Sequence, residues 1–226
     1  MTPTPPLVVV VVLLAVAIVS TTSRTQSRSF ELITASVQDI QDAVAAGVLT
    51  YERLVQLYLA RIAAYDKSGP RLNAVHVNPR ELDIARERDA DRRRFGLRSP
   101  LHGIPIAIKD NVDTKDLPTT GGNIAFAASV PVRDAFVVER LRAAGAILFL
   151  KSNMDEFAMG SQGLSTLGGQ TLNAFDVHRS PGGSSGGTAV AWPRRLPRWE
   201  LRPKLVSRFG VQPRTPASLA SRRPEA

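Results

Sequence analysis

The 226-residue sequence contains no cysteine, and this absence excludes three kinds of chemistry. Without thiols there is no disulfide scaffold, no thiolate metal site and no cysteine nucleophile. The absence of cysteine does not determine the cellular compartment, because exported proteins can also lack disulfides. Histidine is nearly as scarce: His76, His102 and His178 stand far apart, with no partner three or four residues away. We therefore predict no metal site and no cofactor.

Aromatic residues are few, at 6% of the chain, and the net charge of +9 is unevenly placed. Residues 192–226 carry nine Lys or Arg against two Glu, whereas the preceding part is close to neutral. A nucleic-acid surface usually combines basic side chains with stacking aromatics, so we expect no nucleic-acid partner. The same terminal segment holds six prolines and shows no helical or strand periodicity. It is predicted to be a disordered basic tail.

Long apolar runs are limited to one segment, "LVVVVVLLAVAIV" at residues 7–19. Thirteen residues are short for a membrane-spanning helix and typical of the core of a signal peptide. No Lys or Arg precedes the run, while Arg24 and Arg28 follow it, which is unusual for an export signal. We predict that residues 1–23 form a signal peptide or a membrane anchor. The protein would then be exported or membrane-anchored, and cytoplasmic if the start site is mis-assigned.

The part from residue 30 onward has the pattern of an α/β protein, with helical periodicity followed by short buried strands. Ser36 with Asp39 forms a helix-start signature, and Thr50 caps a second helix whose tyrosines fall on its apolar face. The run "RERDADRRR" in a third helix is expected to be a solvated face. We expect helices between Ser36 and Gly47, from Thr50 to Tyr65, from Pro79 to Arg94 and up to Gly145, and strands at Gly103–Val112 and Ala146–Leu150.

Lys109 lies inside the apolar stretch "IPIAIKDN", where a charged amine is costly. Burial lowers the pKa of a lysine, and a lysine with a pKa near 7–8 can act as a general base. A simpler interpretation is an ion pair with Asp110 or Asp113 at the end of the strand. The local sequence leaves both interpretations open.

The stretch "SPGGSSGGTAV" has three possible interpretations: a flexible linker, a phosphate-binding loop or a catalytic loop. A phosphate-binding loop requires a Lys after the glycines, and none follows here. A linker and a serine activated by Lys109 both stay open at this point.

Four motifs in one order make the sequence recognisable: "PLHGIPIAIKDNVDT", "LPTTGG", "SNMDEFAMG" and "SPGGSSGGTAV". Together with the 75-residue step from Lys109 to Ser184, they resemble the amidase signature family. The resemblance covers roughly residues 32–191. It implies an α/β/α sandwich with a mixed central sheet, present here only as an N-terminal portion at residues 30–191.

The resemblance also implies an activity, the hydrolysis of small-molecule amides through a serine acyl-enzyme, and roles for individual residues. Lys109 would be the base, Ser184 the proton-relaying serine on a cis peptide, and Ser185 a support for the loop. Asp155 and Glu156 are interpreted as structural or capping residues.

The family's nucleophile lies roughly two dozen residues after the relay serine, in a G-x-D-x-G-G-S stretch. No such stretch occurs here, and Ser207 in "LVSRFG" lacks the preceding glycines. We therefore expect no nucleophile and no amidase activity in this chain, and we attribute the change after Ala191 to a frameshift or mis-spliced junction. The alternatives are a non-catalytic binding protein that uses its basic tail, and a protein similar to the A subunit of the amidotransferases.

Overall fold

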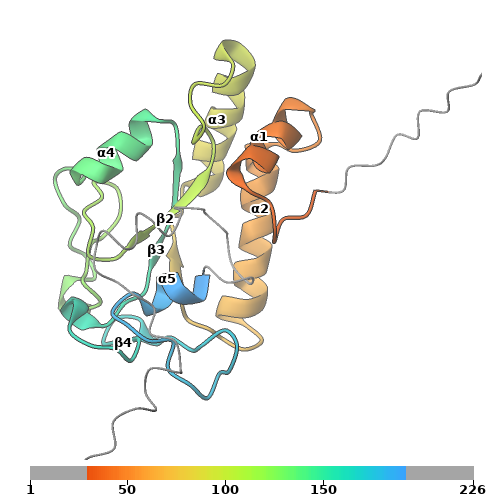
Figure 1. The fold of residues 1–226 in the computed structure, drawn as a ribbon. Coiled ribbons are helices and arrows are strands. Elements are labelled where there is room, and N and C mark those ends of the chain that lie inside the picture. Colours follow the sequence, from red (N-terminus) through yellow and green to blue (C-terminus); the bar gives the residue numbers. More distant parts are fainter. Residues whose placement is uncertain (1–29, 192–226) are drawn as a thin grey trace, which may run out of the picture.

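The computed structural model describes residues 30–191, and these form helices packed around a small central sheet (Figure 1). The predicted segments 1–23 and 192–226 lie outside the described residues. In Figure 1 the helices α1 and α2 lie to the right of strands β2 and β3, and α4 lies to the left. The helices are α1 (Val37–Ala45), α2 (Tyr51–Ile62), α3 (Glu81–Phe95), α4 (Phe136–Ala143) and α5 (Gly186–Ala191). The strands are β1 (Val75–Val77), β2 (Pro105–Lys109), β3 (Ile147–Ser152), β4 (Leu164–Ser165) and β5 (Gly169–Gln170).

The first two helices begin where their caps predict. The Ser36 hydroxyl accepts the Asp39 backbone N–H at 3.1 Å, and the Asp39 carboxylate accepts the Ser36 N–H at 2.8 Å. Thr50 caps α2 by accepting the Arg53 N–H at 3.0 Å. Regular α-helix ends at Ile62, earlier than expected, and a π-helical turn, η1 (Ala63–Lys67), follows. Such turns insert an extra residue, so the face predicted as far as Tyr65 does not continue regularly.

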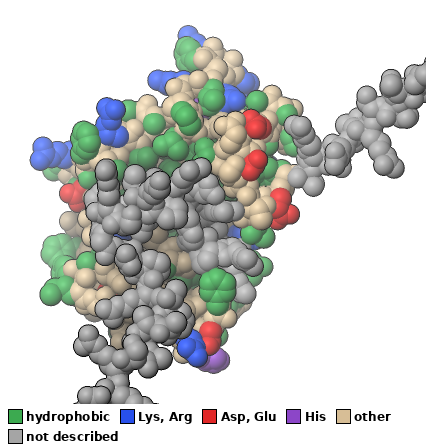
Figure 2. Space-filling view, in the orientation of Figure 1, with side chains coloured by type: hydrophobic (Ala, Val, Ile, Leu, Met, Phe, Trp, Pro, Cys, Tyr) green, Lys and Arg blue, Asp and Glu red, His purple; other side chains and the backbone are tan. Residues whose placement is uncertain are grey.

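The charged helix α3 is largely solvated, and Figure 2 shows Lys and Arg side chains gathered over it at the top of the molecule. One of its carboxylates has a structural role, however. Buried Asp89 accepts the backbone N–H groups of Tyr51 and Glu52, each at 2.9 Å. The negative charge thus sits at the positive end of α2, where the first N–H groups lack helical partners. This contact fixes α2 against α3.

The three-stranded sheet has the order β1-β3-β2, and it is mixed as predicted. Strand β3 runs antiparallel to β1 and parallel to β2. All six residues of β3 are buried, as expected for a central strand covered on both faces. In the register, Lys109 at the end of β2 pairs with Ser152 at the end of β3. Two lysine-bearing strands therefore end side by side.

The short helix α5 packs against all three strands of this sheet. It is tied to β3 by the hydroxyls of Ser152 and Thr188, which are 2.7 Å apart. The Gly187 N–H also donates to the Asn153 carbonyl at 3.0 Å. Two 3-10 turns, η2 (Ile124–Phe126) and η3 (Glu156–Ala158), and the hairpin of β4 and β5 surround the end of the sheet near α5. The glycine-serine loop before α5 is thereby held over the ends of β2 and β3.

Within residues 30–191, no helix is long and apolar enough to cross a membrane.

Candidate active site

Lys109 and Ser184, the two residues predicted to carry the chemistry, meet in the structure. The Lys109 amine donates a hydrogen bond to the Ser184 hydroxyl, with Nζ and Oγ 2.8 Å apart. Lys109 is the last residue of β2, and Ser184 lies two residues before α5. Both side chains are half-buried. The contact is short enough for direct proton transfer once the amine is neutral.

The loop that carries Ser184 is a fixed part of the fold rather than a spacer. The Ser184 carbonyl accepts the Asp155 N–H at 3.1 Å, and the Ser185 carbonyl accepts the Ala189 N–H at 2.9 Å. The peptide bond between Gly183 and Ser184 is cis. Gly182 has φ of +81°, a backbone conformation that glycine adopts readily. The linker interpretation of this stretch is therefore wrong.

Ser185 contributes to the loop through its backbone, since its carbonyl makes the first hydrogen bond of α5. Its side chain makes no hydrogen bond within residues 30–191. The structure thus places Ser185 beside Ser184 at the start of a helix. The supporting role that the resemblance implies for it stays a prediction.

Asp155 organises the backbone beneath the serine loop. Its Oδ1 accepts the N–H groups of Gln162, Gly163 and Leu164 at 3.0, 2.9 and 3.2 Å. Its Oδ2 is buried against Gly183 and has no hydrogen-bond partner in the described part of the chain. Glu156 accepts the Thr166 N–H at 2.9 Å and bonds to Asn123. These contacts agree with the structural interpretation of both carboxylates.

Two opposing effects act on the Lys109 amine. Burial lowers the pKa of Lys109, because the charged form loses part of its hydration. The Asp155 carboxylate acts in the other direction and raises it, but by less. The net result is a pKa below the ordinary lysine value of 10.5. A larger share of the amine is thus in the neutral form that accepts a proton.

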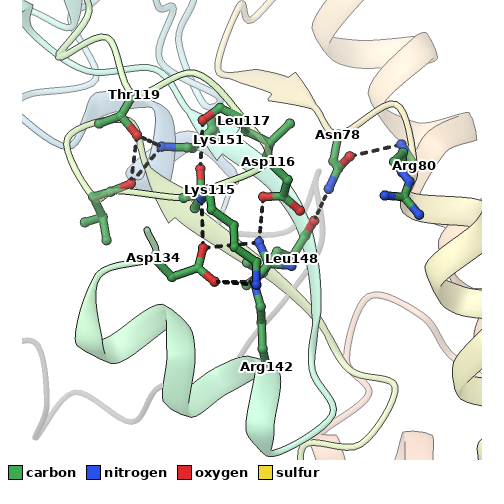
Figure 3. A network of polar contacts seen from close by, with 12 residues as sticks. Asn78, Arg80, Lys115, Asp116, Leu117, Thr119, Asp134, Arg142, Leu148 and Lys151 are labelled. Atoms are coloured by element: carbon green, nitrogen blue, oxygen red, sulfur yellow. Dashed lines mark hydrogen bonds and ion pairs between the residues drawn. The ribbon is translucent and has the colours of Figure 1, made fainter. Parts of the chain in front are cut away.

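A second lysine, Lys151, is the ion-pair partner of Asp110. Lys151 is 4% exposed, and its amine lies 3.6 Å from Asp110 Oδ1. It also donates to the Val112 carbonyl at 2.7 Å and to the Thr119 hydroxyl at 2.9 Å (Figure 3). Burial lowers the pKa of Lys151 as well, and Asp110 opposes this shift. The ion pair with Asp110 that was considered for Lys109 is therefore made by Lys151. Lys109 bonds to Ser184 instead.

Sequence reasoning overlooked Lys151, although the signal was present. It ends the apolar run "AILFLK" just as Lys109 ends "IPIAIK". The same burial argument applies to both, and only the three-dimensional positions of Asp110 and Ser184 separate their partners. Figure 3 shows the neighbouring network in which Asp134 bonds to Arg142, which also contacts Asp116. This network holds the loop after β2 against α4.

Ser207, the serine nearest the position expected for a nucleophile, lies outside the described residues. Among residues 30–191, no group of three or more His, Asp or Glu side chains is arranged to hold a metal ion.

The fold and site define an α/β protein in which a half-buried lysine bonds to a serine on a glycine-rich loop. The family model for Amidase matches residues 53–195. The chain therefore belongs to the amidase family.

Two curated relatives illustrate the similarity. The A subunit of glutamyl-tRNA(Gln) amidotransferase from Cupriavidus metallidurans is 48% identical over 158 residues, covering 69% of this chain and 31% of the relative. The corresponding protein of Chloroflexus aggregans is 45% identical, covering 71% of this chain and 33% of the relative. The chain thus spans about a third of the length of these relatives.

Solved structures show the same partial match. The native peptide amidase of Stenotrophomonas maltophilia superposes with a TM-score of 0.68 at 46% identity. The match covers 70% of this chain and 34% of the amidase. The predicted amidase-signature fold is confirmed for the part of the chain that the structure describes.

Proposed function

We propose that this chain carries the proton-transfer half of an amide-hydrolysing site, with Lys109 as general base and Ser184 as proton relay. The observation that carries the proposal is the 2.8 Å hydrogen bond between Lys109 Nζ and Ser184 Oγ. The lowered pKa of Lys109 supports it, because a general base must be neutral to accept a proton. A small-molecule carboxylic amide is the proposed substrate class of the whole protein.

In the proposed mechanism, neutral Lys109 accepts the Ser184 hydroxyl proton while Ser184 accepts one from a nucleophilic serine. Ser185 holds the loop through its backbone. The relay requires only that the direction of this hydrogen bond reverses, because Lys109 Nζ and Ser184 Oγ are already 2.8 Å apart and the neutral amine can accept the hydroxyl proton. The nucleophile itself is not among residues 30–191, and we propose that the 226-residue chain hydrolyses no amide on its own.

The test is a chimera with a solved relative. Residues 30–191 are joined to the corresponding remainder of the Stenotrophomonas maltophilia peptide amidase, and ammonia release from a peptide amide is measured. We expect activity that falls by about 100-fold or more with Lys109→Ala or Ser184→Ala, the usual range for loss of general base catalysis. Ser129→Ala, at an exposed serine, is the matched control. A chimera as active with Lys109→Ala as without it would refute the proposal.

A second candidate function is that of the A subunit of an amidotransferase, and the 48% identity to the Cupriavidus metallidurans protein favours it. Both functions would use the same lysine and serine. The two functions differ in the acceptor of the group released from the amide. Amide transfer to glutamyl-tRNA(Gln) would support the amidotransferase function, and hydrolysis of a simple amide would support the hydrolase function. A chimera with the remainder of the Cupriavidus metallidurans protein, assayed in both ways, separates them.

We also propose that the protein is exported or membrane-anchored through residues 1–23. The proposal rests on the apolar run at residues 7–19. Fractionation of cells that express the full chain and a form lacking residues 1–23 tests it. Equal recovery of both forms in the cytoplasmic fraction would contradict it.

A further inference from the structure

The Ser184 hydroxyl has one bonding partner in the described part of the chain, the Lys109 amine. No second side chain among residues 30–191 bonds to it, so its remaining lone pair is not committed there. A hydroxyl whose proton is taken by an amine becomes a nucleophile unless another proton replaces it. The geometry therefore allows a second outcome besides relaying a proton.

The loop around this hydroxyl is partly exposed. Gly183 is exposed and Ser184 is half-buried. At Gly182, an added Cβ would meet no atom within 4 Å. The two residues before Ser184 carry no side chain, and at Gly183 the Asp155 carboxylate occupies the place that a Cβ would take.

We propose that Ser184 and Lys109 form a serine-lysine dyad that accepts an acyl group from small activated carboxylic esters. Neutral Lys109 takes the proton from Ser184 Oγ, and Oγ forms a bond to the ester carbonyl carbon. The bond from that carbon to the alcohol oxygen breaks, and the leaving group departs as an anion. The products are acyl-Ser184, protonated Lys109 and the free alkoxide or phenoxide, and Lys109 then returns its proton to water.

This activity goes beyond the proposed function, in which Ser184 only relays a proton. Esters of acidic phenols are the appropriate substrates, because a phenoxide leaves without being protonated. An amine leaving group must first receive a proton, and Lys109 is the only acid placed at Ser184 among residues 30–191. The lowered pKa of Lys109 assists the first step by increasing the neutral fraction. Activated esters, whose leaving group needs no proton, are thus the substrates on which the dyad is tested.

The experiment uses the full 226-residue chain and p-nitrophenyl acetate as the probe. Release of p-nitrophenolate is followed at neutral to mildly alkaline pH, and the acylated residue is located by fragmentation of the tryptic peptide that spans Ser184. We expect one acetyl group on Ser184. Ser184→Ala abolishes it, and Lys109→Arg, which keeps the charge but does not deprotonate, slows it about 100-fold or more.

Matched controls use residues away from the site. Ser129→Ala and Lys115→Arg change an exposed serine and an exposed lysine, and both are expected to acylate at the original rate. Circular dichroism compares the fold of every variant. If Ser184→Ala unfolds the chain, Ser184→Cys takes its place, and the acetyl group is then expected on the new thiol.

Three results would overturn the proposal: acetylation of the Lys109 amine itself, acetylation of Ser185 in place of Ser184, and an acylation rate that Lys109→Arg leaves unchanged. Absence of any acetyl group on a folded chain would overturn it as well. None of these outcomes bears on amide hydrolysis by the chimera, so the two proposals succeed or fail separately.

Discussion

The backbone N–H of Asp155 donates to the carbonyl of Ser184 at 3.1 Å, which joins the segment after β3 to the serine loop. The same residue gathers three further N–H groups with one side-chain oxygen. Its second oxygen is buried beside Gly183. Asp155 therefore acts on the site in two separable ways, through hydrogen-bond geometry and through charge.

Asp155→Asn should separate these effects. Asparagine keeps an acceptor for the N–H groups of residues 162–164 but removes the negative charge near Lys109. Because that charge raises the pKa of Lys109, we expect the pKa to fall further in the variant. Titration of the lysine side-chain nitrogens by NMR measures the change. An unchanged or raised pKa would show that Lys109 does not sense this charge.

Asp155→Ala should affect stability as well. It leaves the buried Gly163 N–H without its acceptor, and an unsatisfied buried donor costs about 1–3 kcal/mol. Urea denaturation of the alanine and asparagine variants gives the comparison. Equal stability of the two would indicate that the hydrogen bonds contribute little.

Gly187→Ala and Gly186→Ala form a matched pair in the first turn of α5. A Cβ at Gly187 would overlap the Ala74 carbonyl and the backbone of Asn153, neither of which can move without disturbing the sheet. At Gly186 the nearest atoms lie 3.1 Å away, in Gly163 and Pro181. Overpacking costs about 1–3 kcal/mol or more, while alanine gains up to about 1 kcal/mol over glycine in a helix.

We therefore expect Gly187→Ala to lower the free energy of unfolding by at least about 2 kcal/mol, and Gly186→Ala to change it by less than about 1 kcal/mol. Chemical denaturation of both variants measures this difference. Similar values for the two would mean that α5 shifts as a unit to accommodate the side chain.

The local sequence predicts those parts of the fold whose signals are local. Ser36 and Thr50 mark helix starts because capping depends on residues three apart. Strand β1 has three residues and β4 and β5 have two each, too few for any periodicity to appear. Helix α5 begins with two glycines, which are poor helix formers, so its sequence resembles a loop.

The candidate site was predictable only in part for a related reason. Burial of Lys109 follows from its apolar neighbours, but its partner lies 75 residues away. The resemblance to a family supplied Ser184, since no local rule distinguishes it from Ser185. Which of the two lysines, Lys109 or Lys151, pairs with Asp110 depends on strand register, and neither segment of the sequence reveals that register by itself.

Lys151→Met should destabilise the protein strongly. It leaves the buried Asp110 carboxylate without its cation, and breaking a buried pair costs about 3–5 kcal/mol. The double variant Lys151→Met/Asp110→Asn should lose less than the two single variants together, because no unpaired charge remains. Urea denaturation of all three variants gives the coupling energy.

Lys115→Met is the control for this cycle. Lys115 is exposed and lies 4.0 Å from the buried Asp134, which keeps its partner Arg142 at 2.9 Å when Lys115 is replaced, so we expect a cost of about 1 kcal/mol or less. If Lys151→Met costs no more than Lys115→Met, the buried pair does not stabilise the loop after β2.

The stability of the protein should also depend on pH through Lys109. Because the folded-state pKa of Lys109 is below 10.5, the unfolded chain binds more protons than the folded chain between these two values. Stability therefore increases as pH rises through this window, and the increase ends once the unfolded lysine is also neutral. Lys109→Met removes this titration. Lys151 is present in both proteins, so its own titration cancels in the difference.

The measurement is the free energy of unfolding of the wild-type chain and of Lys109→Met at several values from about pH 8 to about pH 11. We expect the difference, wild type minus variant, to grow in favour of the wild type as pH rises. A difference that falls with pH would mean that Lys109 is held in its charged form, and that Asp155 outweighs burial at this site.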